Sequence, residues 1–212
     1  MWEYDSALPP WRYSYGVSIP LVSWTVTTPP AIEPVTLQEL KTYARYDGAY
    51  EDEELLGFIT AARMEAEAYV GRSFITQTIT AICEVPGAKV AAPMSQIVVP
   101  GKSYIKLPRP NVLTITTVKA EDADTPDTWI TYAGYALDNA DKRHPKLWMI
   151  DDWPDGPRLQ IVYTAGYGPK RTDVPGIIRT FIKRRATAML DNRADKMSGL
   201  SLQGIDSERI VW

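Results

Sequence analysis

The clearest hydrophobic pattern in the chain lies between Val35 and Gly71, where apolar residues recur with the period of an α-helix. Thr36-Leu37-Gln38-Glu39 has the form of a capping box, in which the first and last side chains each bond the other residue's backbone N–H. From Leu55 onward the apolar positions follow the spacing of one helix face, and Gly71 suits the end of that helix. The pattern predicts a hairpin of two helices over residues 35–72.

After Ser73 the helical period gives way to short runs of β-branched residues separated by proline and glycine. Such runs predict strands, here at Phe74–Val85, Gln96–Val99, Tyr104–Leu107, Val112–Ala120, Thr128–Tyr132, Lys146–Ile150 and Arg158–Thr164. We therefore expect a small antiparallel β domain over residues 73–169. The helical period returns after Asp173, the expected N-cap, and predicts a last core helix over residues 170–193.

The two ends of the chain show neither pattern. Residues 1–34 hold six prolines and six Trp or Tyr residues, which predicts an extended arm with one short strand at Val22–Thr28. Residues 194–212 form a glycine-containing tail. The predicted fold is thus α+β, with a helical core, an inserted small antiparallel β domain, an N-terminal arm and a C-terminal tail.

Composition draws attention to the same two ends. The chain has 7 Trp and 12 Tyr against 3 Phe, and both of the abundant types are enriched at protein contacts. We predict a partner-binding arm formed by Trp2, Trp11, Tyr13, Tyr15 and Trp24; the alternative is an arm that is disordered or packs on its own subunit. Apolar anchors in the tail are expected at Leu200, Leu202, Ile205, Ile210, Val211 and Trp212.

Charge separates the two helical regions, although the whole chain carries only -3. From Glu33 to Gly71 three basic and nine acidic residues give 3 − 9 = −6, and from Lys170 to Lys196 eight basic and three acidic residues give 8 − 3 = +5. Such complementary surfaces predict head-to-tail contacts between subunits, through Glu51, Asp52, Glu53, Glu54, Arg179, Lys183, Arg184 and Arg185. The alternatives are attraction within one subunit, ordinary solvated faces, and weak DNA binding by Lys183, Arg184 and Arg185.

The residues needed for catalysis are sparse. His144 is the single histidine and Cys83 the single cysteine, so we expect a loop histidine, a buried inert thiol and no zinc site. Asp151, Asp152 and Asp155 are the only candidates for a carboxylate hydrolase, and a turn between strands explains them better. We expect no enzyme, cofactor or metal. Without an export signal or membrane span in the sequence, we expect a soluble protein made in the cytoplasm.

Five segments, in order, resemble the phage head–tail connector (adaptor) family. The first three run from Pro34 to Lys41, from Glu51 to Arg63 and from Ala66 to Thr78, matching that family's helix start, second helix and following strand. The fourth is Leu107–Val112, and the fifth has two neighbouring parts, Val162–Gly168 and Val174–Arg179. The resemblance covers roughly residues 34–193 and leaves out both ends of the chain.

The resemblance implies a virion protein of the capsid neck, made in the host cytoplasm. It implies a ring, commonly of about twelve subunits, that binds under the portal, extends the DNA channel and docks a tail, stopper or tail-terminator protein. The C-terminal segment would bind the portal, and genomic DNA would pass through without sequence-specific binding. Alternatives are another neck, tail-completion or capsid-decorating protein, or the weak DNA-binding module.

Overall fold

The computed structural model describes residues 17–19, 21–48, 51–85, 103–151, 154–191, 205 and 209. Its chain divides into two compact units. The described parts of residues 1–27, 78–108 and 112–164 make up what we call the β unit, and those of 28–77, 109–111 and 165–212 make up the helical unit. The chain therefore passes between the units several times, and each unit is assembled from separate stretches of sequence.

Helices α1 (Leu37–Ala44) and α2 (Asp52–Val70) form the predicted hairpin. The capping box is present, because the Thr36 hydroxyl accepts from Glu39 N at 3.1 Å and the Glu39 carboxylate accepts from Thr36 N at 2.8 Å. Gly71 ends α2 in the left-handed conformation, at a φ of 73°, with its N–H bonded to Glu67 O. Local sequence signals thus set both limits of the hairpin as predicted.

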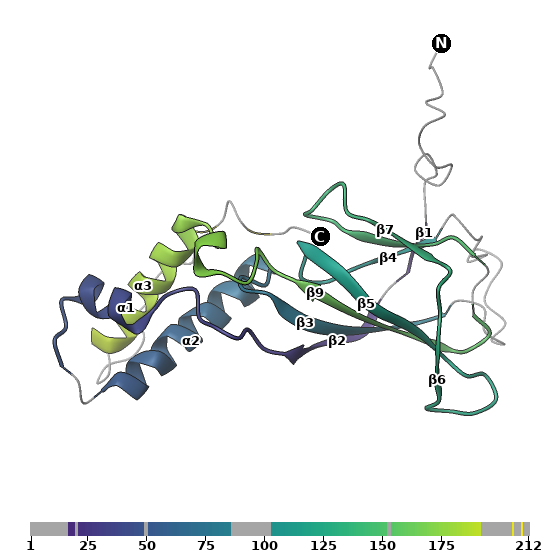
Figure 1. Ribbon diagram of the computed structural model, residues 1–212, viewed down its shortest axis with the longest axis horizontal. Helices are drawn as coiled ribbons and strands as arrows, with labels where there is room; N and C mark the ends of the chain where they lie inside the picture. Colours follow the sequence, from purple (N-terminus) through teal and green to yellow (C-terminus); the bar gives the residue numbers. More distant parts are fainter. Residues whose placement is uncertain are drawn as a thin grey trace, which may run out of the picture. The chain divides into compact units, whose positions relative to one another are not determined.

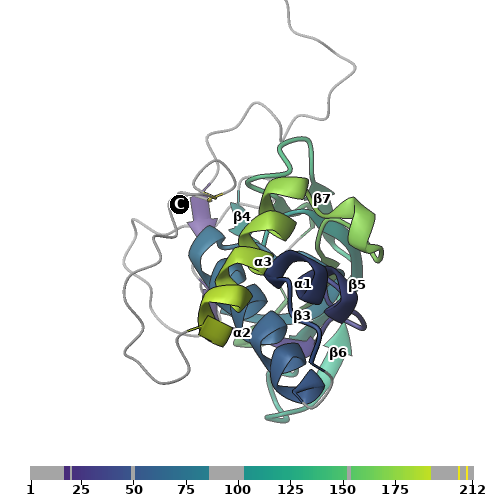
Figure 2. The ribbon, with the colours of Figure 1, turned by 90° about the vertical axis from the view of Figure 1, so that its left-hand side faces the viewer.

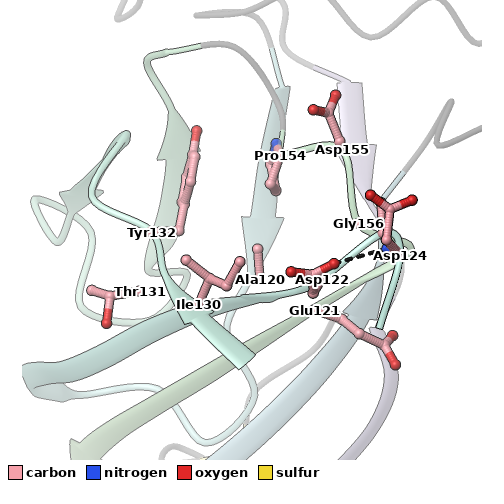
Figure 3. Close-up of a pocket in the computed structure, with 11 residues that line it drawn as sticks. Ala120, Glu121, Asp122, Asp124, Ile130, Thr131, Tyr132, Pro154, Asp155 and Gly156 are labelled. Carbon is pink, nitrogen blue, oxygen red and sulfur yellow. Dashed lines mark hydrogen bonds between the residues drawn. The ribbon is translucent and has the colours of Figure 1, made fainter. Parts of the chain in front are cut away.

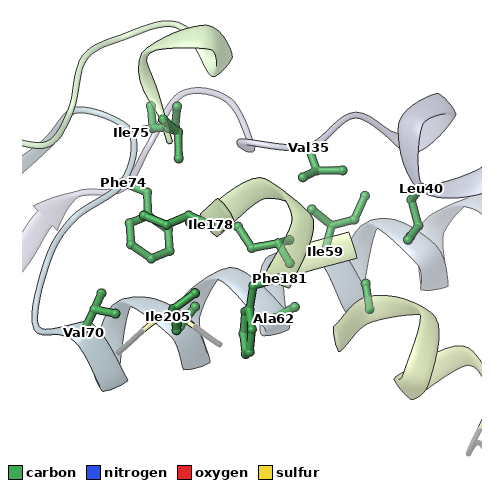
Figure 4. Close-up of a cluster of buried hydrophobic side chains, with 14 of the residues drawn as sticks. Val35, Leu40, Ile59, Ala62, Val70, Phe74, Ile75, Ile178, Phe181 and Ile205 are labelled. Carbon is green, nitrogen blue, oxygen red and sulfur yellow. The ribbon is translucent and has the colours of Figure 1, made fainter. Parts of the chain in front are cut away.

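Helix α3 (Gly176–Asp191) packs with α1 and α2 around one apolar cluster (Figure 2). Its buried residues include Ile178, Phe181 and Ile182, which belong to the same cluster as Leu55, Ile59 and Ala62 of α2. Figure 4 shows part of this cluster. The expectation that Asp173 caps α3 was wrong. Asp173 instead ends a short 3₁₀ helix, η3 (Arg171–Asp173), where its carboxylate accepts from Lys170 N at 2.9 Å.

The first sheet of the β unit has the strand order β1-β4-β8-β7. Strand β1 (Val17–Ile19) pairs in parallel with β4 (Ser103–Lys106), whereas β8 (Lys146–Met149) lies antiparallel to β4 and to β7 (Tyr135–Asp138). Ile105, Leu147 and Met149 are fully buried. One face of this sheet therefore contributes to the core of the unit.

The second sheet has five strands in the order β2-β3-β9-β5-β6 (Figure 1). They are β2 (Leu21–Thr28), β3 (Gln77–Glu84), β9 (Arg158–Ala165), β5 (Val112–Glu121) and β6 (Trp129–Thr131). Strands β3 and β9 alternate strictly between buried and partly buried positions, the pattern of strands with one face in a core. Strand β2 lies at the edge, and nearly all its residues are exposed.

The predicted fold class was wrong. The described residues contain two sheets, of four and five strands, and the β part is not a small insertion into a helical core. It is not wholly antiparallel either, because β1 joins it in parallel. The error has a physical reason: helix signals lie within a few adjacent residues, whereas β1 and β2 gain their place from pairing with strands far along the chain. Predicted strand Gln96–Val99 lies outside the described residues.

Candidate assembly surfaces

Acidic residues predicted to contact other subunits cluster at the start of α2, and Glu51 and Asp52 have partners within the chain. The Tyr46 hydroxyl donates to the Glu51 carboxylate, and Lys41 forms an ion pair with Asp52. Glu53 and Glu54 are exposed on the first turn of the helix, where the helix dipole favours negative charge. This turn therefore presents acidic side chains to solvent.

The basic residues predicted on α3 are used mainly within the helical unit. Arg185, only 7% exposed, makes a two-point ion pair with Glu65 of α2, at 2.7 and 3.0 Å. Arg179 lies 3.8 Å from a carboxylate oxygen of Glu39, and the Lys183 ammonium lies 5.5 Å from the centre of the Tyr43 ring. Arg184 is exposed. The opposite charges of the helical regions thus act largely inside the subunit, which also leaves less basic surface for DNA.

A buried polar network around Glu67 was missed by the sequence analysis. Its carboxylate accepts from Arg63 Nη1 at 2.8 Å and, through the other oxygen, from Phe74 N and Gln77 Nε2, both at 2.7 Å. Arg63 also donates to Glu33 at 2.7 Å. Burial alone would lower the pKa of Arg63, but the two carboxylates outweigh it and raise the pKa above its ordinary value.

Arg109 extends this network from a distant part of the chain. Its guanidinium donates to the backbone carbonyls of Glu67 and Arg72, the latter at 2.9 Å. Arg109 has a φ of 52°, a conformation that non-glycine residues adopt only when their surroundings hold them there. The one sequence signal for this network is the four-residue spacing of Arg63 and Glu67. That spacing is equally typical of an ordinary ion pair on a helix surface. The network connects α2 with segments before and after it in the sequence and so stabilises the helical unit.

Of the predicted tail anchors, the structure describes Ile205 alone. Ile205 is fully buried in the apolar cluster of the helical unit (Figure 4). Arg209, another described residue of the tail, lies over the Tyr69 ring of α2, 5.2 Å from its centre. The remaining anchors, Leu200, Leu202, Ile210, Val211 and Trp212, lie outside the described residues. At Ile205, therefore, the tail contributes to the subunit's own fold.

Among the predicted arm residues, the structure describes Trp24. It lies in the edge strand β2 and is 40% exposed, with Val22 and Val26 also exposed two positions to either side. These three side chains share one face of the strand, because successive residues alternate between faces. Trp2, Trp11, Tyr13 and Tyr15 lie outside the described residues. The part of the arm nearest the core is therefore a strand of the second sheet.

An acidic pocket lies beside the turn that joins β5 to β6 (Figure 3). Glu121, Asp122, Asp124 and Asp155 line it, and Asp122 accepts a hydrogen bond from Asp124 N at 2.8 Å. Glu121 is held by Arg158 through two bonds of 2.6 Å, which lowers the pKa of its carboxyl to about 2. Within the described residues, no group of His, Cys, Asp and Glu has the arrangement of a metal site.

The other candidate reactive residues are placed where the sequence suggested. Cys83 is buried on β3, and burial raises the pKa of its thiol to about 12. His144 lies in the loop before β8, where its Nδ1 is 2.9 Å from Asp141. Asp151 and Asp155 lie in the loop between β8 and β9, and Asp152 lies outside the described residues. None of the helices in the described part has the length and apolar content of a membrane span.

Comparisons with known proteins identify the fold. No protein-family profile and no curated protein sequence matches the chain. Chains in solved structures do, among them three from GTA particles. The chain is similar to one in the neck of an empty GTA particle computed with C6 symmetry, with a TM-score of 0.71, 19% identity, and coverage of 90% of this chain and 97% of that one.

A second similar chain comes from the virion of a native gene transfer agent (GTA) particle, with a TM-score of 0.67, 19% identity, and coverage of 90% and 97%. A third comes from the neck of a native GTA particle computed with C12 symmetry, with a TM-score of 0.64, 20% identity, and coverage of 89% and 96%. At these identities the likeness is one of fold. It extends over nearly the whole of both chains.

Proposed function

We propose that this chain is a structural protein of the neck of a phage-like particle, located in the virion at the junction of head and tail. The observation that carries the proposal is the fold, shared over 90% of the chain with a neck component of a gene transfer agent particle. The five segments that resemble phage connectors support the same conclusion from sequence. The role is one of assembly, and it requires no catalytic residue.

In this role the chain forms a homo-oligomeric ring, a dodecamer, that binds beneath the portal. The necks of the similar structures were computed with C6 and C12 symmetry, and a ring of twelve is compatible with both. The ring continues the DNA channel and offers a docking surface for the tail, stopper or tail-terminator protein. Genomic DNA passes through its lumen without sequence-specific contacts.

Particles made with and without this chain test the proposal. Purified particles from cells that lack the gene should contain filled heads without attached tails, and a plasmid copy of the gene should restore attachment. Electron microscopy of the restored particles, with the chain carrying a small exposed tag in the loop at Lys142, should show density in the neck. Normal tailed particles without the chain, or a tag elsewhere in the particle, would contradict it.

The C-terminal end of the chain is proposed to bind the portal. Because Ile205 belongs to the core, the test removes residues 206–212 only and leaves the apolar cluster complete. The truncated chain should melt close to the temperature of the full chain but fail to pellet with purified portal-containing heads. A matched control removes none of the tail but replaces exposed Lys142 with Glu. Unchanged attachment of the truncated chain would overturn this assignment.

A further inference from the structure

One face of helix α2 is exposed from Leu56 to Ala68 and carries no charge along that stretch. We call it the α2 face and define it by Leu56, Gly57, Ala61, Met64 and Ala68, all of which are exposed. Leu56 and Met64 are 45% and 58% exposed. A solvated helix face ordinarily carries charged residues. An exposed, uncharged face of four turns therefore suits a contact with another protein.

The charged residues that follow Glu54 on α2 all point elsewhere. Arg63 and Glu67 are buried in the polar network, and Glu65 pairs with Arg185 of α3. The uncharged character of the α2 face is thus not a product of low charge in the helix. Arg63, Glu65 and Glu67 are charged, but each side chain binds a group of its own subunit.

Gly57 gives an independent reason to expect a neighbour on this face. Glycine inside a helix is less stable than alanine, so its presence there calls for a steric cause. Within the subunit there is none, because a Cβ added at Gly57 would meet no atom within 4 Å. A glycine in open space is explained if the backbone of another chain approaches it closely.

Helix α3 has an exposed face of a different kind. We call it the α3 face and define it by Ile177, Thr180 and Arg184, which are exposed at helical spacing. The α3 face ends at basic Arg184, whereas acidic Glu53 is exposed just before the start of the α2 face. Because α2 and α3 pack on each other through their buried sides, the α2 face and the α3 face are two distinct surfaces of one subunit.

We propose that the α2 face of one copy binds the α3 face of the next copy, with Glu53 directed toward Arg184 of that copy. The two surfaces differ, so the contact is head-to-tail and can repeat around a closed ring. Apolar and small residues supply close packing, and the opposite charges set the direction of docking. The inference rests on the proposed ring and names the surfaces that form it.

A bulky residue on the α2 face tests the contact. Gly57→Trp should leave the purified full-length chain folded, because the site is open, but should reduce its incorporation into particles roughly tenfold or more. The control, Gln38→Trp, places the same side chain on an exposed position of α1. If Gly57→Trp entered neck rings to the same extent as the wild-type chain, the inference would be overturned and the proposed function would stand. A wild-type chain missing from necks would instead reject the proposed function.

Charge reversal tests the direction of docking. Glu53→Arg and Arg184→Glu should each lower incorporation, since each places like charges at the contact. The double variant should restore it, because every contact in the ring again joins opposite charges. A double variant that assembles no better than the two single variants would overturn the pairing.

Cross-linking tests whether the contact joins unlike surfaces. Ala61→Cys and Thr180→Cys each add one accessible thiol, while Cys83 is buried. In rings assembled from a mixture, a short bismaleimide should join the two variants to each other, and neither variant to itself. Lys142→Cys serves as the exposed control. Self-linking of Ala61→Cys would indicate a two-fold contact, and linking to a different protein another occupant; either result, or no link in intact rings, would overturn the inference.

Discussion

The helical unit and the β unit stabilise their charged residues in opposite ways. In the helical unit the pair Arg63–Glu67 is inside, with side chains 7% and 5% exposed, and it is completed by backbone and amide donors. In the β unit the pair Arg158–Glu121 lies at the rim and is open to water on one side only, because the Arg158 side chain is 40% exposed and the Glu121 side chain 3%. On β3 and β9, largely apolar residues at alternate positions are buried and contribute to the core of the β unit.

The difference indicates which substitutions should destabilise each unit most. A buried ion pair is costly to break, because the partner that remains is left charged in a site with little water. A pair whose arginine is open to water, like the one at the rim, can exchange part of its contacts for solvent and loses less. The helical unit therefore depends on a few polar residues from separate segments, and the β unit on many interchangeable apolar ones.

The largest expected effect comes from Glu67. Glu67→Leu should lower the free energy of unfolding by about 3–5 kcal/mol, because Arg63, Phe74 N and Gln77 all lose their acceptor. Urea unfolding followed by far-ultraviolet circular dichroism measures it, and Cys83 labelling reports separately on the β unit. Glu67→Gln, which keeps one acceptor oxygen, should lose less. A loss below about 1 kcal/mol for Glu67→Leu would remove the proposed contrast between the units.

Ile205 tests whether the tail belongs to the helical unit. Ile205→Ala should cost about 2–5 kcal/mol, as expected for a fully buried side chain in an apolar cluster. The matched control, Arg209→Ala, should cost about 1 kcal/mol or less, because it removes a single cation–π contact at an exposed position. Thermal unfolding of the three chains gives the comparison, and equal losses for both substitutions would contradict it.

The capping box of α1 has a smaller contribution. Thr36→Ala removes the acceptor for Glu39 N and should cost about 1 kcal/mol. Thr36→Ser keeps the hydroxyl and should stay within a few tenths of the wild-type value. Denaturant midpoints with an unchanged m-value would show that the effect is on stability. Indistinguishable midpoints for Ala and Ser would show that the cap does not stabilise α1.

The rim pair of the β unit should make the stability depend on pH only in acid. The hydrogen bonds from Arg158 lower the pKa of Glu121 from an ordinary value of 4.5 to about 2. Their stabilisation is therefore complete above the unfolded pKa and is lost as the pH falls from 4.5 through 2. Unfolding of Glu121→Gln, compared with wild type across this range, should depend less steeply on pH. Parallel pH profiles would contradict the assignment.

How far the sequence predicts the structure depends on how local each signal is. The helix start at Thr36 and the end at Gly71 are set by residues within one turn, and both predictions were confirmed. Strand β2 was predicted from its β-branched run, but its membership of the second sheet was not. Strand β7, with Ala136 and Leu137 at its centre, carries no strand signal and was missed.

The contacts at the candidate assembly surfaces could not be predicted from the sequence for the same reason. The opposite charges of the two helical regions could be counted from the sequence, but not their pairing, so the internal Arg185–Glu65 bond could not be told from a contact between subunits. Arg109 follows a strand and precedes a proline, as many loop residues do. Its role depends on the carbonyls of Glu67 and Arg72, which only the folded chain brings to it.

The discontinuity of the helical unit also has a consequence during synthesis. Glu65 and Arg185 are 120 positions apart, so the ribosome releases α1 and α2 long before α3, while strands β3 to β9 are made in between. Until α3 arrives, the hairpin exposes the apolar face that Ile178 and Phe181 later cover. We expect the helical unit to fold last, slowed by the long loop that must close. A subunit of this design becomes complete only after α3 has been made.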